Sequence, residues 1–339
     1  MSRTATAIAW VLGVWLLVGG CGEPPTREAA IDHFVKGKIL LDAGDVEMAL
    51  AELGKAVKID PELSIAHTTI GDIHRWQGRW ELARGAYENA CRTNPFAFKA
   101  HYNLGVTYQA LAAAAEVAET VREYLVKAVE VYLRAIVLSP SDFDSHLNVS
   151  ACYFQLGYSA EAEQYCRAAL EIDPSSAMAY ANLGTIKDSQ GSLSEAIQAY
   201  EASLEQSPSQ PDLLLCLGSA YIRQQRWNAA LQAFTEAAAQ APTDSTPWEK
   251  TGACYFYLRD FPRAEEAYTR ALSLNPQSAA AYRGMGVAHV AQFILDRTRT
   301  DLRDRGLEEW RASLTLQPSQ EDLRRLVDKY GPAPAAPQL

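Results

Sequence analysis

The chain repeats one pattern of small, large and polar positions every 34 residues. When the repeat is numbered so that a recurring proline is position 32, positions 8, 20 and 27 carry only Gly, Ala or Ser in all eight units. Position 24 is a large apolar or aromatic residue in seven of them. A repeat of this length is typical of a helical hairpin that buries its apolar face only by stacking on copies of itself. The prolines, spaced by 34, 45, 34, 34, 34, 34 and 42 residues, are Pro61, Pro95, Pro140, Pro174, Pro208, Pro242, Pro276 and Pro318.

The small positions predict two helices in close contact within every unit. A larger side chain at a helix crossing holds the two axes apart, whereas Gly, Ala and Ser allow the backbones to approach. The large residue at position 24 is then expected to fill the space between hairpins. It is Leu53, Tyr87, Tyr132, Tyr200, Phe234, Tyr268 and Trp310 in seven units, and Cys166 in the fourth.

This pattern resembles the tetratricopeptide repeat (TPR) family, and the run AYANLGTIKDSQGSLSEAIQAYEASLEQSP at 179–208 shows the resemblance clearly. It extends over 291 of the 339 residues, from Ala30 to Gln320. The resemblance implies an all-α fold, a right-handed superhelix or α-solenoid of eight hairpins at 30–320. A generic alanine-rich helical bundle, the alternative, would not keep its register over eight units.

Two units are longer than the repeat, and a further helix follows the array. The third unit has 11 extra residues, close to three helical turns, so we interpret 110–126 as extended helix that projects beyond the stack. The eighth has 8 extra residues near the densely charged run 296–306, which is either a solvated extension or a docking surface. Residues 321–331 carry apolar side chains at i, i+3, i+4 and i+7 and predict a polar-backed capping helix. Residues 332–339 are expected to form a disordered tail.

The N-terminus has the pattern of a secretion signal. One positive charge, Arg3, precedes 16 largely apolar residues, fewer than the roughly 20 that a membrane-spanning helix needs. The sequence Val18-Gly19-Gly20-Cys21 then resembles the bacterial lipobox. This resemblance implies removal of a signal peptide, 1–20, diacylglycerol on the Cys21 sulfur and an acyl chain such as palmitate on its new amine. The alternative is an uncleaved anchor with an incidental cysteine.

These features predict a lipoprotein of the bacterial cell envelope that faces the periplasm. Several acyl chains hold a protein stably at a membrane, whereas one does not. Residues 21–29 would be a lipidated tether that keeps the first repeat close to the bilayer. By the sorting rule of lipoproteins, Gly22 after the cysteine, rather than Asp, indicates the outer membrane.

Charge and motifs argue against several function classes. The net charge of −10 disfavours nucleic acid and anionic lipid as partners of the repeats. No phosphate loop, HExxH, GxSxG or nucleotide fingerprint occurs, and only 29 residues precede the repeats and 19 follow them. We therefore expect no enzyme, no cofactor and no small-molecule substrate.

The histidines and cysteines have structural interpretations. All six histidines replace apolar or aromatic residues at positions 4 and 11, and equivalent residues of neighbouring hairpins are about 8–10 Å apart. Metal ligands must lie about 2 Å from one ion, so core packing is expected and a metal site is not. Cys152 and Cys166 either pair in an oxidising compartment or pack as small apolar residues. The histidines are His33, His67, His74, His101, His146 and His289.

The family resemblance implies that positions 2, 5, 6, 9 and 12 line a concave groove. At position 6, Asn103, Asn148 and Asn182 resemble the asparagine ladder of O-linked N-acetylglucosamine transferase, which holds a peptide by its backbone. The alternative is ordinary polar surface. The chaperone-type clamp is not matched, because Phe34 and Lys38 stand where Lys and Asn would be. Apolar groove residues suit a protein or peptide ligand; they are Tyr102, Leu147, Phe154, Leu215, Ile222 and Phe256.

Taken together, the patterns predict a membrane-anchored protein–protein interaction scaffold. Its partner segments would bind in the groove of units three to five. By layout the chain resembles TPR lipoproteins such as the pilotin of type IV pilus assembly, which implies a role in pilus or secretion assembly. The alternative is an adaptor that regulates envelope hydrolases or proteases, and the neighbouring genes would distinguish the two.

Overall fold

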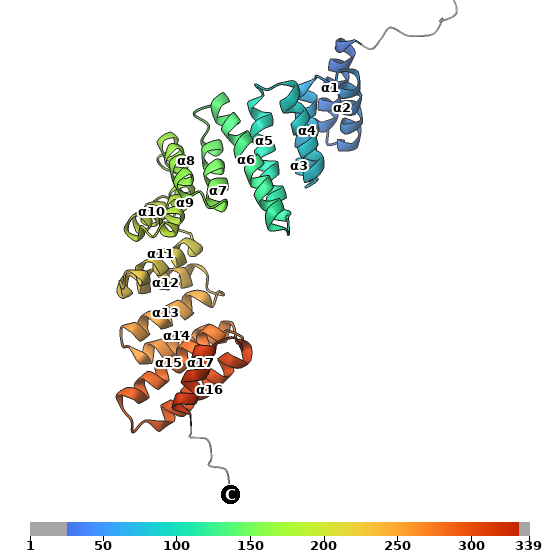
Figure 1. The fold of residues 1–339 in the computed structure, drawn as a ribbon. Coiled ribbons are helices and arrows are strands. Elements are labelled where there is room, and N and C mark those ends of the chain that lie inside the picture. Colours follow the sequence, from blue (N-terminus) through green and yellow to red (C-terminus); the bar gives the residue numbers. More distant parts are fainter. Residues whose placement is uncertain (1–25, 332–339) are drawn as a thin grey trace, which may run out of the picture. The chain divides into compact units, whose positions relative to one another are not determined.

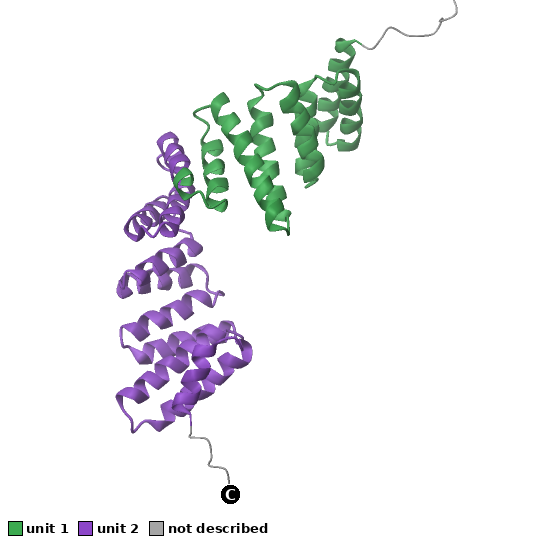
Figure 2. Ribbon diagram, viewed as in Figure 1, with its two compact units in different colours: residues 1–162 green, residues 163–339 purple. Residues whose placement is uncertain are grey.

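The computed structural model describes residues 26–331, and within that range the chain consists of 17 helices joined by short turns (Figure 1). This confirms the predicted all-α solenoid fold. The ranges predicted to be the signal peptide, with Cys21, and the C-terminal tail lie outside the described residues. None of the helices within 26–331 combines the length and the apolar character that crossing a membrane requires. The chain divides into two compact units at residue 162, within the eighth helix (Figure 2).

The first unit contains three complete hairpins and the first helix of the fourth. Thr26 caps the first helix, since its Oγ1 accepts a hydrogen bond from the Ala29 amide at 3.3 Å. The hairpin array therefore begins at Arg27, inside the predicted tether. The helices are α1 (Arg27–Asp42), α2 (Val46–Ile59), α3 (Ser64–Trp76), α4 (Trp80–Thr93), α5 (Phe98–Ala114), α6 (Ala118–Leu138), α7 (Phe143–Gln155) and the start of α8 (Ser159–Ile172).

The second unit contains the remainder of α8, four hairpins and a final single helix. That last helix, α17 (Glu321–Tyr330), occupies the range predicted for the cap. Its Leu323 is fully buried against Val290, Leu307 and Trp310. The other helices are α9 (Ala177–Ser189), α10 (Leu193–Gln206), α11 (Pro211–Arg223), α12 (Trp227–Gln240), α13 (Thr246–Tyr257), α14 (Phe261–Leu274), α15 (Ala279–Leu295) and α16 (Thr300–Leu316).

Within a hairpin, the glycine at position 8 lies directly against the large side chain at position 24. A Cβ added to Gly71 would lie 2.6 Å from the ring of Tyr87, and one added to Gly184 would lie 2.4 Å from the ring of Tyr200. Each large side chain thus fills the space between the two helices of its own hairpin, whereas we expected it to fill the space between hairpins. Any side chain at position 8 would displace it. The fourth hairpin, which has Ser150 at position 8, is also the one with a smaller residue at position 24.

Both insertions lengthen two paired helices instead of extending one. In the third hairpin α5 has 17 residues and α6 has 21, whereas α9 and α10 have 13 and 14. The chain leaves the helical conformation at 115–117, so our interpretation of 110–126 as extended helix is wrong. The added turn of α5 buries Leu111 and Ala112, and α5 lengthened on its own would leave these residues exposed.

The eighth insertion is divided in the same way. Helices α15 and α16 have 17 residues each, and the run 296–306 forms the turn between them and the start of α16. The Asp296 carboxylate closes this turn, because it accepts hydrogen bonds from the amide and the hydroxyl of Thr298 at 3.0 and 2.6 Å.

Three histidines at position 4 bind the turn that precedes their hairpin. The Nε2 atoms of His67, His101 and His146 lie 2.9, 3.2 and 3.0 Å from the carbonyl oxygens of Pro61, Pro95 and Pro140. These contacts join each first helix to the recurring proline, a role that spacing alone did not indicate. Cys152 and Cys166 are both free thiols and not a disulfide.

Adding one methyl group at a position-8 glycine should test the packing rule. We expect Gly71→Ala to destabilise the first unit by about 1–3 kcal/mol, because the hydroxyl of the Tyr87 ring is held at 2.7 Å from Asp72 and the ring has nowhere to move. Gly85→Ala, in the same hairpin, has open space around the new methyl group. It should stabilise the helix by up to about 1 kcal/mol. Urea unfolding of both variants checks this, and equal effects would contradict the rule.

The fully buried His289 should make the stability of the second unit depend on pH. Burial alone lowers the pKa of this imidazole, but the hydrogen bond and charge of Glu309, at 2.8 Å, and the charge of Glu265, at 3.3 Å, outweigh burial and raise the pKa above 6.5. Arg305, paired with Glu265 at 2.7 Å, is the other charged group at this cluster.

Because the folded-state pKa is raised, this stabilisation is complete below about pH 6.5 and is lost as the pH rises through the raised value. We expect the free energy of unfolding to fall between pH 6 and pH 9 in the wild type and to fall less in His289→Gln. Urea unfolding at both pH values measures the difference. A variant with the wild-type pH dependence would show that His289 is not responsible.

Candidate functional site

The first unit has a cavity of about 470 Å³ where the first helices of its hairpins lie side by side. Its wall comes from α1, α3 and α5 and from the turn that leads into α5. Most of these residues occupy positions 1, 2, 5, 6 and 9 of their units, largely the positions that the family resemblance assigns to the groove. The lining residues are Phe34, Lys38, Ser64, Ile65, Thr68, Thr69, Asp72, Asn94, Ala97, Phe98, Lys99 and Ala100.

Asp72 is the polar centre of this cavity. Its carboxylate accepts hydrogen bonds from the Tyr87 hydroxyl at 2.7 Å, the Lys99 ammonium at 2.7 Å and the Asn103 amide at 2.8 Å. Burial and the hydrogen bond to Asp72 raise the pKa of Tyr87, so its phenol remains protonated and donates. Three donors therefore satisfy a carboxylate that is only 8% exposed, and Asp72 is a structural group and not a free ligand-binding one.

Lys38 is the charged residue of the cavity whose side chain lacks a partner in the described part of the chain. Its ammonium group has no ion pair or hydrogen bond within residues 26–331. Lys99 is neutralised by Asp72, so the cavity carries one uncompensated positive charge. Its apolar wall includes Ile65, which is 55% exposed, and Phe98, whose ring stacks on that of Tyr102 at 6.1 Å. This combination is suited to a segment with apolar side chains and a carboxylate.

Asn103 and Asn148, the two expected ladder residues of the first unit, differ in their surroundings. Asn103 is 5% exposed and donates its amide to Asp72. Asn148 is half-buried, and its place in the ladder stays a prediction. The Asn103 amide is already bound within the protein, so the structure corrects the expected ladder at this position. The reason is that the preceding hairpin presents Asp72 to Asn103, a pairing across 31 residues of sequence.

The other expected groove residues vary in exposure. Leu147 is only 4% exposed and belongs to the core, whereas Tyr102 and Phe154 of the first unit are half-buried. In the second unit Asn182 is half-buried and has no hydrogen bond with a described residue. Leu215 and Ile222 pack against the cluster around Phe234, and Phe256 packs against the cluster around Tyr268.

Sequence reasoning missed the residues that make the first cavity. In the sequence, Lys38 stands out only as a mismatch to the chaperone-type clamp. Nothing in the sequence singles out Ile65, Asp72 and Lys99, which occupy positions 2 and 9. The signal was present, because positions 2 and 9 are groove positions in the family.

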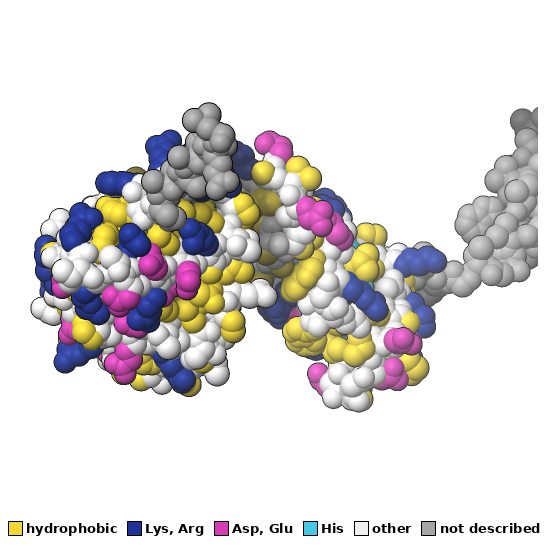
Figure 3. Space-filling model, turned by 90° about the horizontal axis from the view of Figure 1, so that it is seen from below, with side chains coloured by type: hydrophobic (Ala, Val, Ile, Leu, Met, Phe, Trp, Pro, Cys, Tyr) yellow, Lys and Arg dark blue, Asp and Glu magenta, His cyan; other side chains and the backbone are white. Residues whose placement is uncertain are grey.

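On the face shown in Figure 3, hydrophobic side chains form patches among charged ones.

Family models match the chain in four places. A model of the C-terminal domain of cilia and flagella-associated protein 70 matches residues 168–293. Models of TPR repeats match 33–63, 71–111 and 127–177.

Several solved structures share the fold. The C-terminal part of a TPR repeat-containing protein from Cytophaga hutchinsonii is 15% identical, with a TM-score of 0.60 over 75% of this chain and 97% of that one. Pseudomonas aeruginosa pilF is 18% identical, with a TM-score of 0.51 over 64% and 94%. YrrB, a TPR protein with an unusual peptide-binding site, is 21% identical, with a TM-score of 0.51 over 59% and 99%.

Proposed function

Because the chain belongs to the tetratricopeptide repeat family, we propose that it is a protein–protein interaction scaffold whose first cavity binds an extended segment of a partner protein. The observation that carries this proposal is the cavity of about 470 Å³ beside the unpaired Lys38. A peptide-binding site is stated for YrrB, which shares the fold. Stacked hairpins of this kind offer long surfaces for extended partners.

The chemistry of the cavity defines the segment that fits. Apolar side chains of the partner would contact Phe34, Ile65 and Phe98, and burial of that area would supply most of the affinity. A partner carboxylate would pair with Lys38. The hydroxyl protons of Thr68 and Thr69 are already donated to carbonyl oxygens of their own helix, so these hydroxyls would not compete with Lys38 as donors to a partner carboxylate.

Photo-crosslinking should locate the partner on this surface. A photoreactive phenylalanine analogue in place of Ile65 is expected to form adducts with a partner in intact membranes, because Ile65 lines the cavity and is 55% exposed. The same analogue in place of Ile39, which is 63% exposed on α1 but does not line the cavity, is the matched control. Lys38→Gln should reduce the adduct yield threefold or more, since it removes a charged hydrogen bond. Equal adducts at both positions would overturn the proposal.

We further propose that the scaffold is anchored in the outer membrane of a bacterial envelope by lipid on Cys21. This residue lies outside the described range, so the proposal rests on the apolar run and the lipobox resemblance. An anchor followed at once by hairpins is the layout of the pilus-assembly lipoproteins that this chain resembles. Pilus or secretion assembly is therefore the role we propose, with regulation of envelope hydrolases as the alternative.

The mature N-terminus decides the question of the anchor. We expect intact mass spectrometry of the membrane-extracted protein to show loss of residues 1–20 and the added mass of acyl chains on Cys21. The variant Cys21→Ser should keep its signal sequence and lose the lipid mass, because a hydroxyl cannot replace the thiol as acceptor. An intact Met1 start in the wild type, or an unmodified Cys21, would contradict the lipoprotein proposal.

A further inference from the structure

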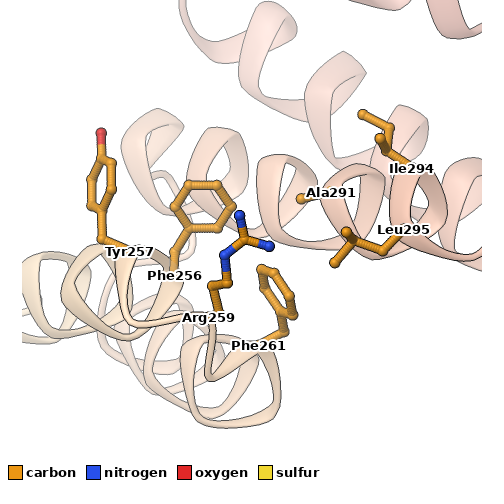
Figure 4. A pocket seen from close by; sticks show the side chains of 7 residues that line it. All are labelled: Phe256, Tyr257, Arg259, Phe261, Ala291, Ile294 and Leu295. Atoms are coloured by element: carbon orange, nitrogen blue, oxygen red, sulfur yellow. The ribbon is translucent and has the colours of Figure 1, made fainter.

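The second unit has a separate cavity of about 300 Å³ at the ends of α13 and α15 (Figure 4). One side is formed where α13 ends and α14 begins, by Phe256, Tyr257, Arg259 and Phe261. The other side is formed by Ala291, Ile294 and Leu295 near the end of α15.

The wall from α15 exists because the eighth hairpin is longer than the repeat. Helix α15 has 17 residues, against 13 for first helices such as α9. Ile294 and Leu295 lie in this additional turn, and they are 42% and 62% exposed. Large apolar side chains exposed at the rim of a cavity indicate a surface that another molecule covers.

The opposite wall is held in place by aromatic contacts. The ring of Tyr257 stacks on Trp227 at 4.2 Å and 10°, and the rings of Phe256 and Phe261 lie 5.9 Å apart. A wall that is already ordered loses little conformational entropy when it binds a ligand.

Arg259 is the one charged residue that lines this cavity. Its guanidinium group lies between Phe256 and Phe261 and points toward α15 (Figure 4). It has no ion pair or hydrogen bond with any residue of the described range. Neither nearby carboxylate in the sequence is available to it, because Asp260 caps α14 and pairs with Arg263 at 3.3 Å, and Asp296 closes the turn after α15.

The backbone at Arg259 has a conformation that glycine adopts at the same position of other units. Its φ angle is 62°, in the left-handed region that is unfavourable for residues with a side chain. The same position of the repeat is a glycine with positive φ in four other units, at Gly44, Gly78, Gly157 and Gly191. Gln225, with a φ of 59°, has this conformation too, so the backbone alone does not mark Arg259 as functional, but a glycine in its place would fit without strain.

We propose that this cavity binds a partner segment in which a large apolar side chain is adjacent to a carboxylate. The apolar side chain would lie against Phe256, Phe261 and Leu295, and the carboxylate would accept paired hydrogen bonds from the planar guanidinium of Arg259. The chain as a whole carries a net charge of −10, so an unpaired cation in an apolar cavity is a local complement to an acidic segment. This inference rests on the proposed function, that the repeats bind protein segments, but it uses different residues.

The experiment uses the purified mature chain and fluorescein-labelled 12-residue peptides. One peptide has adjacent Glu and Leu in a neutral, polar background, and two analogues replace the Glu by Gln or the Leu by Ala. We expect fluorescence anisotropy to show about tenfold tighter binding of the Glu-Leu peptide than of either analogue. Higher salt should reduce the difference in affinity between the Glu-Leu peptide and its Gln analogue, because it screens the attraction between the two charges.

The decisive variant is Arg259→Gly. It removes the guanidinium while glycine suits the backbone, so the melting temperature should stay equal or rise. In a chain that also carries Lys38→Gln, so that the first cavity offers no cation to the same carboxylate, binding of the Glu-Leu peptide should fall about tenfold, to the level of the Gln peptide. Gln225→Gly is the matched control, because Gln225 is a non-glycine residue with positive φ, at 59°, at the same position of its unit, and it does not line the cavity. It should leave binding unchanged.

A second pair of variants tests the apolar wall. Leu295→Ser should abolish the preference for the Glu-Leu peptide over the analogue in which Ala replaces the Leu. Leu316→Ser, at an exposed position on α16 outside the cavity, should not. Equal binding of the Glu and Gln peptides, or full binding by Arg259→Gly, overturns the inference. So does binding of decanoate, but of no peptide, through Arg259, because it identifies a lipid carboxylate as the ligand.

Failure here is distinguishable from failure of the proposed function. If Lys38→Gln weakens peptide binding and Arg259→Gly does not, then only the first cavity binds segments, which overturns this inference and leaves the proposed function intact. If Arg259→Gly alone weakens binding, the second cavity is supported independently of the first.

Discussion

The contact of a large side chain with a glycine inside each hairpin is the interaction on which the rest of the structure depends. Tyr87 against Gly71 and Tyr200 against Gly184 bring two helix backbones together without leaving a void. A side chain on the glycine would displace a fully buried ring, and interiors packed at crystal-like density tolerate such a change poorly. Because every hairpin except the fourth uses the same contact, one local rule repeated along the chain builds both units.

The insertions obey this rule and also create surfaces that the regular repeat lacks. An added turn is stable only when the facing helix lengthens with it, so that each side chain it adds finds a partner. In the third hairpin added residues such as Leu111 and Ala112 are buried. In the eighth hairpin some of them, Ile294 and Leu295, remain exposed beside a cavity. A hairpin of regular length lacks this exposed apolar surface, so Ile294 and Leu295 are not required for the fold.

The presence or absence of a bonding partner separates charged groups with a structural role from those available to a ligand. Asp72 and His289 are buried, and each is held by several partners, which is the arrangement that a desolvated polar group requires. Lys38 and Arg259 lie at cavities and have no partner among the described residues. In an acidic protein, cations without a partner beside apolar walls are available to an acidic segment of another molecule.

The sequence by itself determined the eight hairpins, their small and large packing positions and the capping helix, because these depend on contacts that recur within one repeat and appear as a period. It also indicated the positions that line the first cavity. Only the tertiary structure decided that the chain turns back at 115–117. The sequence did not indicate this turn, because residues 110–126 contain no Gly or Pro. It also decided that Asn103 is bound to Asp72 and that the Arg259 guanidinium has no partner within residues 26–331. Those outcomes depend on neighbours from other hairpins, and a period in the sequence does not show which polar side chains meet.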